Sequence, residues 1–592
     1  MQNHHGINLI TLGVLACLSA PLAAALPSVS QEPSGNAVYL FEQTVPDSLS
    51  SQHGVISISD QRAKDGTHAL KWQHEPAATL TIRSPIVYRD AADSATPLTL
   101  MAWIYNERPV DDVLTFRFAQ GDRAAASFQA KLNFSGWRGI AVPYRDMQGK
   151  PSAQMDRVTI TAPAQAGTLY FDQIMLGVPV DNRWPLPDYT TPFANTAVNE
   201  MVSKNWSALL MYDEMLSQRF PTLNFDVPFD DQRGPSAPIY RRFDDYHGIR
   251  HDSPVSAEQV AQNLAAYRQL GIHPLADGTI GGRPLDHPNR QHFMKVKGVF
   301  TPQTLEAITD ANAIRNVGKI LLQTARYLRS DTLSAQQRDA LQRQFLDTTR
   351  YVLDQGFARG SGYQIITHVG YQTRELFDAW FIQRNLLAQH QLLAPTQQAM
   401  MWYNATGRIF EPDAQIVDAN VDILNTQLQW MVKSILMLPD PAQRDALLNQ
   451  TREWLAKTVL RSQGVSGGFK PDGSIFHHSQ HYPAYAKDAF GGLAPTVYAL
   501  SESPFRLPTE AHQRLKEVLL KMRIYTKETQ IPLTLSGRHP TGLHAITIAP
   551  FKWMALAGSP DGSQTVDPEL AAAYARLCLL YTSDAADDAN VV

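Results

Sequence analysis

The chain has 592 residues, which is more than one compact core usually holds, so we expect two or more domains. Hydrophobic residues make up 44% of it and charged residues 18%, a balance that excludes a wholly disordered protein. The net charge of −4, with no basic tail and no zinc-ribbon spacing, argues against a nucleic-acid-binding protein.

Residues 1–25 have the pattern of a signal peptide. The apolar run from Leu9 to Leu26 contains the small residues Ala23, Ala24 and Ala25, which are typical of a signal-peptidase site. It predicts export to a bacterial periplasm or out of the cell, with lipoprotein anchoring at Cys17 as a second interpretation. The other cysteine is Cys578, so the exported chain has no internal disulfide, and no later apolar stretch is long enough to span a bilayer.

Residues 26–180 are predicted to form a β-sandwich of the jelly-roll kind. Apolar and polar residues alternate in segments such as 56–59 and 114–118, as in half-buried strands, and Gly, Pro, Asp and Asn separate these segments at short intervals. Pro185, Pro187 and Pro192 then indicate an extended linker over residues 181–194, because proline fixes φ and lacks an N–H.

Residues 195–576 are predicted to be mainly helical. Apolar residues recur every three to four positions over 305–328 and again over 417–435, where Pro439 ends the pattern. Helices of similar length without intervening strands favour an α/α toroid, with long loops over residues 220–300 around a helical segment near 256–270. We expect residues 577–592 to be a disordered or artefactual tail, since they resemble translated sequencing-adapter sequence, and Cys578 to have no function.

The segment 470–485 concentrates residues that could do chemistry. It holds three histidines and two tyrosines within its last nine positions, after a Pro-Asp-Gly turn signal. The spacing of His477 and His481 suits a zinc pair, but that motif needs a helix and a Glu at the next position, and the chain has His478 there and Pro483 two residues after His481. The remaining interpretations are a proton-transfer site on a loop or a polar loop that packs aromatic edges.

Three smaller clusters accompany this segment. Arg538 follows Gly537 and precedes His539, and an arginine fork suits a carboxylate. His368 and Arg374 lie at a predicted loop-to-helix junction. Trp402, beside Tyr403, could stack on a sugar ring or belong to the core.

Taken together, these clusters resemble polysaccharide lyase family 8, and within it the chondroitin sulfate ABC lyases. The resemblance begins at residues 39–42 and 64–72, passes through 368–371 and the His478-to-Tyr485 spacing, and reaches the Gly-Arg-His-Pro segment at 537–540. It implies an N-terminal sandwich, an α/α toroid and then large antiparallel β-domains, which this sequence does not reach. We therefore expect a C-terminally truncated copy of uncertain activity, which we expect to be a monomer.

The resemblance also implies the site residues. His478, Tyr485 and Arg538 match the catalytic His, Tyr and Arg of the family, while its catalytic Glu has no match here. The substrate-binding residues are expected to be His368, Arg374, Trp402, His477 and His539, with His477 standing where close relatives often have Arg.

The implied reaction is β-elimination on an acidic polysaccharide, namely chondroitin or dermatan sulfate with hyaluronan as a further candidate. Neutralising the uronate carboxylate stabilises an enolate-like intermediate, His478 or Tyr485 removes the C5 proton, and Tyr485 protonates the leaving O4. No cofactor is implied for this chemistry. Two alternatives stay open: a glycoside hydrolase, which needs two opposed carboxylates, and a non-catalytic or inactive carbohydrate-binding fragment.

The N-terminal sandwich resembles carbohydrate-binding modules that contain a structural cation. Glu42, Asp65 and Asp172 stand where such modules supply oxygen ligands, which suits Ca²⁺ or Na⁺. The alternative is that all three are ordinary acids at strand ends and turns.

Overall fold

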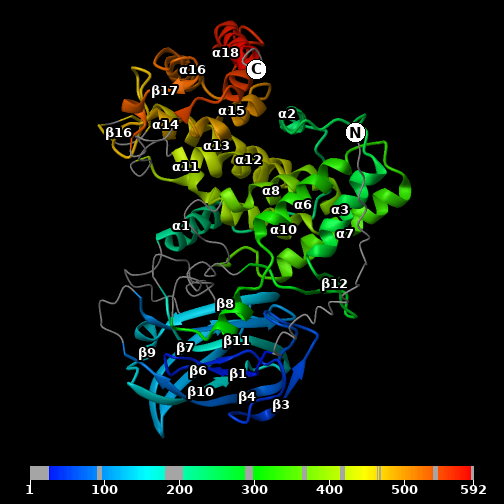
Figure 1. Ribbon diagram of the computed structural model, residues 1–592, viewed down its shortest axis with the longest axis vertical. Coiled ribbons are helices and arrows are strands. Elements are labelled where there is room, and N and C mark those ends of the chain that lie inside the picture. Colours follow the sequence, from blue (N-terminus) through cyan, green and yellow to red (C-terminus); the bar gives the residue numbers. More distant parts are fainter. Residues whose placement is uncertain are drawn as a thin grey trace, which may run out of the picture.

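The computed structural model describes residues 26–89, 96–180, 204–286, 298–362, 370–413, 421–462, 464–465, 468–537 and 544–588. Up to Pro179 the regular structure is strands apart from one short 3-10 helix, Tyr144–Asp146, and helices dominate from Lys204 onwards. In Figure 1 the large sheet lies at one end of the molecule and the helices form an elongated body beside it. The chain is thus a mixed protein with a large N-terminal sheet.

The N-terminal strands form an antiparallel sheet centred on β4. This strand pairs with β3, β10 and β11, and β11 also pairs with β2 and β5. The alternation predicted for residues 114–118 is confirmed, because Leu114, Phe116 and Phe118 are buried while Arg117 is exposed. The strands are β1 (Val29–Gln31), β2 (Ala37–Tyr39), β3 (Leu49–Ser59), β4 (Ala69–Val87), β5 (Leu98–Asn106), β6 (Val113–Gln120), β7 (Arg123–Lys131), β8 (Gly136–Pro143), β9 (Gln148–Gly149), β10 (Gln154–Thr161) and β11 (Gly167–Pro179).

Part of this sheet is covered on both faces. β5, β8 and β11 are buried along almost their whole length, which a strand with one solvated face would not be. Trp103, Tyr105, Trp137 and Tyr170 from these strands belong to the same hydrophobic cluster as the helices. The helical body therefore packs directly on the sheet.

Two glycines permit a very close approach of backbones at this junction. A Cβ atom on Gly136, at the start of β8, would lie 2.6 Å from the carbonyl oxygen of Asp354. A Cβ atom on Gly356 would lie 2.6 Å from the carbonyl oxygen of Trp137. Because either side chain would collide with main-chain atoms, only glycine fits at both positions.

Buried polar contacts join the same two parts of the chain. The ammonium of Lys64 donates to the side-chain oxygen of Gln355 at 2.6 Å, and the hydroxyl of Tyr105 donates to Asp354 at 2.9 Å. Burial lowers the pKa of Lys64 to about 7 and raises the pKa of Asp354 to about 6. Arg62 forms an ion pair of 2.5 Å with Asp277.

The first part of the helical region departs from the sequence predictions at one predicted helix and in one predicted loop stretch. The helix expected over 417–435 is divided at Gln427, whose φ of −127° interrupts it. The stretch 220–300, expected to be long loops, contains α2 and the hairpin β12–β13 beside the anticipated α3. The elements up to this division are α1 (Lys204–Arg219), α2 (Ala237–Tyr246), α3 (Ala257–Gln269), β12 (Ile272–Pro274), β13 (Ile280–Gly282), α5 (Pro302–Thr309), α6 (Ile314–Tyr327), α7 (Ala335–Asp354), α8 (Gly370–Ile382), α9 (Arg384–Gln389), α10 (Leu393–Tyr403) and α11 (Val421–Thr426).

The remaining elements lead to the end of the chain. α18 continues to Asp588, so the helix does not stop at residue 577, where we expected a tail to begin. Within the described residues, none of the helices combines the length and the apolar character needed to cross a membrane. These elements are α12 (Leu428–Leu436), α13 (Pro441–Leu460), β14 (Gly468–Phe469), β15 (Ile475–His477), β16 (Gln480–His481), α14 (Pro483–Ala486), α15 (Ala489–Leu500), α16 (Thr509–Ile524), β17 (Gln530–Ile531), β18 (His544–Ala545), α17 (Ala549–Leu556) and α18 (Pro568–Asp588).

Candidate active site

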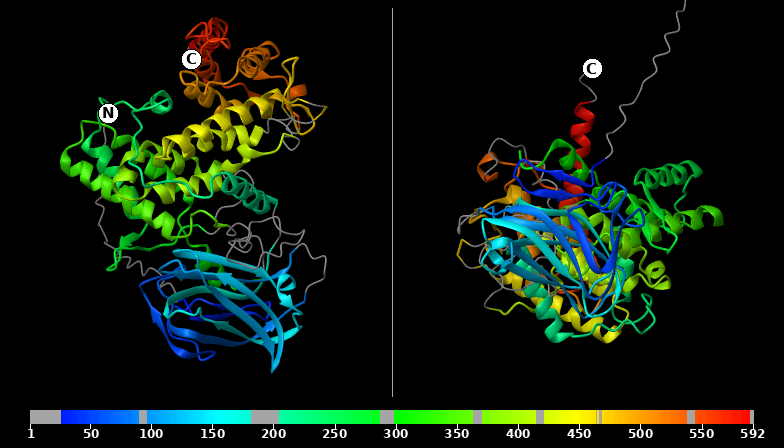
Figure 2. Two further views of the ribbon diagram at one scale, coloured as in Figure 1. Left: turned by 180° about the vertical axis from the view of Figure 1, so that it is seen from behind. Right: turned by 90° about the horizontal axis from the view of Figure 1, so that it is seen from below.

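A small hairpin followed by a short helix holds the His/Tyr segment. The sequence predicted an irregular loop here, but β15 and β16 pair antiparallel and α14 starts at Pro483, where a proline fits the first turn of a helix. His478 and Ser479 form the turn between the strands with φ angles of 51° and 62°. Such left-handed angles are uncommon for residues with a side chain, so the hairpin constrains the position of His478. In Figure 2 these elements lie at the end of the helical body that is remote from the large sheet.

The rings of this segment lie against one another. His477 stacks on Tyr485, with ring centroids 4.7 Å apart and planes within 1° of parallel. His478 lies 5.8 Å from the same tyrosine ring, and the fully buried Tyr482 lies 5.6 Å from it. The hairpin and α14 therefore bring the two predicted proton-transfer residues side by side, and His477 supports the tyrosine ring from one face.

A carboxylate that the sequence analysis missed contacts Tyr485. The hydroxyl of Tyr485 donates a hydrogen bond to Oδ1 of Asp422 at 2.8 Å. Asp422 lies on α11, 63 residues earlier in the chain, and α11 packs against α15 with the backbone of Leu424 close to Gly492. No local motif marks Asp422, so only the packing of α11 could reveal it.

Arg374 lies beside Tyr371, which is itself near Asp422. Its guanidinium carbon is 4.7 Å from the ring of Tyr371, whose hydroxyl accepts a hydrogen bond from Asn425 at 3.0 Å. Burial raises the pKa of Tyr371, and the nearby carboxylates of Asp488 and Asp422 add to the effect. Tyr371 therefore stays protonated at neutral pH and can serve as a hydrogen-bond donor.

The segment before Arg538 lies against the same ring cluster. Gly537 has a φ of 59°, and a Cβ atom on it would lie 2.5 Å from the ring of Tyr482. Arg538 and His539 themselves lie outside the described residues, as does His368. The structure thus places the residue before Arg538 beside the tyrosines but leaves the roles of these three side chains as predictions.

Trp402 does not belong to this surface, so its assignment as a substrate-binding residue is wrong. It is 3% exposed and lies in the hydrophobic cluster of the helices, and its indole N–H donates to the carbonyl of Ser361 at 2.8 Å. An aromatic pair on a helix has the same pattern in a core as on a binding face, which is why the sequence did not distinguish the two.

The three acids proposed to hold a cation are only partly brought together. The carboxylate of Asp172 accepts hydrogen bonds from the backbone N–H groups of Lys64 and Asp65, whereas Glu42 accepts from the backbone and hydroxyl of Thr67. Both carboxylate oxygens of Asp65 are buried and meet no donor at bonding geometry. Among the described residues, no group of three or more His, Cys, Asp or Glu side chains is arranged to hold a metal ion.

The chemistry available at the His/Tyr cluster is proton transfer. An imidazole and a phenol lie together, and a carboxylate already accepts the phenolic proton in a hydrogen bond. These residue types can move a proton from a carbon atom to a leaving oxygen.

The chain is similar to known lyases. The family described as "Lyase, catalytic" matches residues 237–583, and "Lyase, N terminal" matches residues 36–193. The chain is 65% identical over 553 residues to the chondroitin sulfate ABC exolyase of Proteus vulgaris, covering 93% of this chain and 56% of that protein. It is 30% identical over 553 residues to the chondroitin sulfate ABC exolyase of Bacteroides thetaiotaomicron, covering 91% of this chain and 52% of that protein.

The chain thus spans about half the length of the curated relatives it matches. Among solved structures, the chondroitin AC lyase of Streptomyces coelicolor A3 in complex with chondroitin sulphate aligns with a TM-score of 0.38 and 14% identity, over 55% of this chain and 43% of that one.

Proposed function

The chain belongs to polysaccharide lyase family 8, whose catalytic region matches more than half of it, and on that premise we propose that it cleaves chondroitin and dermatan sulfate by β-elimination. The bond broken joins O4 to C4 of the uronic acid, and the product carries a C4–C5 double bond. The observation that carries the proposal is the contact of His478 and Tyr485 with each other and of Tyr485 with Asp422. Hyaluronan is a further candidate substrate.

The difficult step is removal of the C5 proton, which is a poor acid. Positive charge at the uronate carboxylate stabilises the enolate-like intermediate, and we assign this to Arg538 and His368. His478 or Tyr485 takes the C5 proton, and the phenol of Tyr485 gives a proton to O4 as the C4–O4 bond breaks. Two neighbouring bases suit two substrates, because glucuronate and iduronate present C5 with opposite stereochemistry.

Asp422 enables Tyr485 to act as a base at neutral pH. A free tyrosine with a pKa of about 10 is a poor base at neutral pH. If the phenolic proton moves to Asp422 along the 2.8 Å hydrogen bond while the phenolic oxygen takes the C5 proton, no free tyrosinate is needed. The proton on Asp422 returns to the phenolic oxygen when that oxygen protonates O4, so the residues end as they began.

Other side chains are assigned to binding. We propose that Arg374, with its guanidinium beside Tyr371, attracts the anionic polymer, and that His539 contributes next to Arg538. His477 is buried behind Tyr485, so its proposed contribution to binding acts mainly through the position of the tyrosine ring.

We further propose a structural cation at Asp65 and Asp172. Burial, with Asp172 and Glu42 nearby, raises the pKa of Asp65 well above its usual range. The buried side-chain oxygen of Gln173 also meets no donor among the described residues. Carboxylate and amide oxygens suit Ca²⁺ or Na⁺, and such a cation would favour the charged form of both acids.

The finer architecture and the setting are also proposals. The helices after residue 195 fit an α/α toroid, and the N-terminal strands fit a jelly-roll sandwich like that of carbohydrate-binding modules. The apolar run at the start of the chain supports export to a periplasm or the cell exterior. An acidic polysaccharide is the expected partner, without nucleic acid, and the expected state is a monomer.

The decisive experiment follows the ultraviolet absorbance of unsaturated uronate during incubation of the chain with chondroitin sulfate, dermatan sulfate or hyaluronan. We expect absorbance to rise, and Tyr485→Phe to abolish the rise. Tyr327→Phe, at a half-buried tyrosine on α6, is the matched control and should leave the rate unchanged. New reducing ends without the absorbance would identify a hydrolase and overturn the proposal.

A further inference from the structure

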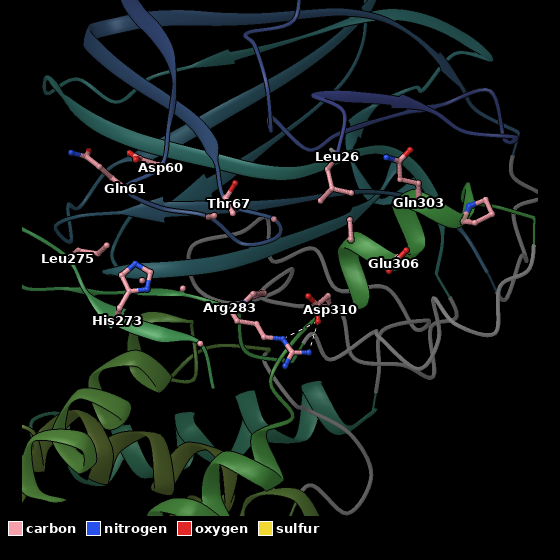
Figure 3. A pocket seen from close by; sticks show the side chains of 18 residues that line it. Leu26, Asp60, Gln61, Thr67, His273, Leu275, Arg283, Gln303, Glu306 and Asp310 are labelled. Atoms are coloured by element: carbon pink, nitrogen blue, oxygen red, sulfur yellow. Dashed lines mark hydrogen bonds and ion pairs between the residues drawn. The ribbon is translucent and has the colours of Figure 1, made fainter. Parts of the chain in front are cut away.

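A large open pocket lies where the sheet meets the helical body. Its volume is about 1150 Å³. One wall is the loop between β3 and β4, including Asp60, Gln61 and Thr67, and the other is formed by the β12–β13 hairpin and α5. Figure 3 shows Asp60, Gln61 and Thr67 on the sheet side, with His273 and Leu275 across the space from them. Pockets between domains are common places for ligands.

Contacts within the structure hold both walls. The Arg62–Asp277 ion pair ties the β3–β4 loop to the turn of the β12–β13 hairpin. Gln61 accepts hydrogen bonds from Tyr170 at 2.8 Å and from Lys71 at 3.2 Å, and these contacts fix its amide group. The pocket is therefore preformed, which lowers the entropy cost of binding.

The charge of the pocket disfavours the acidic polymer as its ligand. Arg283 is neutralised by Asp310, to which its guanidinium donates at 3.0 Å and 2.5 Å (Figure 3). Asp60 and Glu306 also line the pocket, and neither forms an ion pair within the described part of the chain. The two carboxylates give the pocket an excess of negative charge, which repels uronate and sulfate groups.

The same side chains define what would bind. Ionised carboxylates only accept hydrogen bonds, so the ligand must offer donors, and a sulfate ester offers none. Sugar hydroxyls are donors, while Leu26, Leu275 and Pro284 provide apolar surface for the C–H faces of sugar rings. We propose that this pocket is a second carbohydrate site, specific for a neutral, hydroxyl-rich oligosaccharide. Its volume suits several sugar rings, because pockets for drug-sized ligands span roughly 300–1,000 Å³.

The pocket is separate from the His/Tyr site. β12 lies beside the large sheet in Figure 1, whereas α14 and β16 lie at the remote end of the helical body. A neutral saccharide in the pocket would therefore tether the enzyme to a glycan without occupying the site proposed to process the acidic chain. The inference does not depend on lyase activity, so its test is binding alone.

The test measures binding of maltotetraose, cellotetraose and tetra-N-acetylchitotetraose to the full chain by saturation-transfer NMR and calorimetry. An unsulfated chondroitin tetrasaccharide is the anionic comparison and spermine the cationic one. We expect saturable binding of at least one neutral tetrasaccharide that the chondroitin oligosaccharide does not displace. Replacing Asp60 and Glu306 together by alanine removes two charged acceptors and should weaken this binding by about tenfold or more.

Asp47→Ala combined with Asp339→Ala is the matched control. It removes one exposed carboxylate from each part of the chain outside the pocket and should leave the affinity unchanged. Failure of all three neutral tetrasaccharides to bind, or equal binding by the Asp60/Glu306 variant, would overturn the proposal. Binding of spermine alone would do the same, because the pocket would then select charge and not hydroxyl groups.

Discussion

Substitution of Asp422 by asparagine tests the proton path directly. The amide has nearly the shape of the carboxylate, and its oxygen can still accept the hydrogen bond from Tyr485 that now spans 2.8 Å. It cannot take up the phenolic proton. The variant therefore preserves the geometry of the site while removing the proposed transfer step.

The substitution should have a small effect on stability and a large effect on kcat. Replacing a hydrogen bond to a charged group by a neutral one should cost about 1 kcal/mol of stability. Loss of general acid–base assistance should lower kcat by at least about 100-fold, with little change in KM, because such assistance is typically worth 10²–10⁴-fold. The assay is the initial rate of unsaturated uronate formation across a range of substrate concentrations, with the unfolding temperature measured in parallel.

Asp422→Glu separates the chemical role from a structural one. It keeps a carboxylate but adds a methylene group to a half-buried position, so packing alone would make it the worse variant. The proton path predicts the reverse order for kcat, with Asp422→Glu more active than Asp422→Asn. A kcat for Asp422→Asn close to that of the native chain would refute the reasoning.

Three further predictions follow from other contacts. Gly537→Ala places a Cβ atom 2.5 Å from Tyr482 at a residue with a φ of 59°. It should lower the free energy of unfolding by roughly 1–3 kcal/mol, as measured by denaturant titration. An unchanged denaturation midpoint would contradict the contact. Burial raises the pKa of Asp354 from 3.8 to about 6. The free energy of unfolding should therefore fall, by up to on the order of 3 kcal/mol, as the pH rises between these two values. Asp354→Asn should remove this fall, and its unfolding temperature should exceed that of the native chain above pH 6 but not near pH 4. Asp65→Asn should raise the unfolding temperature in a chelator, since it removes a carboxyl group whose charged form burial disfavours. It should also abolish stabilisation by added Ca²⁺, and an unaltered Ca²⁺ response would exclude the cation site.

The sequence was most informative where a structural property depends on neighbouring positions. The alternation in residues 114–118 predicted the buried faces of β6, and the Pro-Asp-Gly signal predicted the turn that the structure forms, with Gly473 donating to the carbonyl of Lys470. His478 and Tyr485 are seven positions apart, so a hairpin and one helical turn suffice to bring their rings together.

The sequence was least informative where the structure depends on packing between distant segments. Asp422 reaches Tyr485 only because α11 packs on α15, and nothing around residue 422 indicates a site. The break at Gln427 involves neither proline nor glycine, so the apolar spacing continues across it. Trp402 was misassigned because helical spacing does not show which face of a helix is covered.

The close approach at Gly136 and Gly356 bears on how freely the two parts of this protein could be exchanged between relatives. Gly136 belongs to the sheet and Gly356 to the helical part, and each contacts main-chain atoms of the other part. In a chimera with a larger residue at either position, the added side chain would prevent the sheet and the helices from packing together. Sheet and helices are therefore expected to be inherited as a matched pair. A recombinant library joined between them should recover folded proteins mainly from parents that carry both glycines.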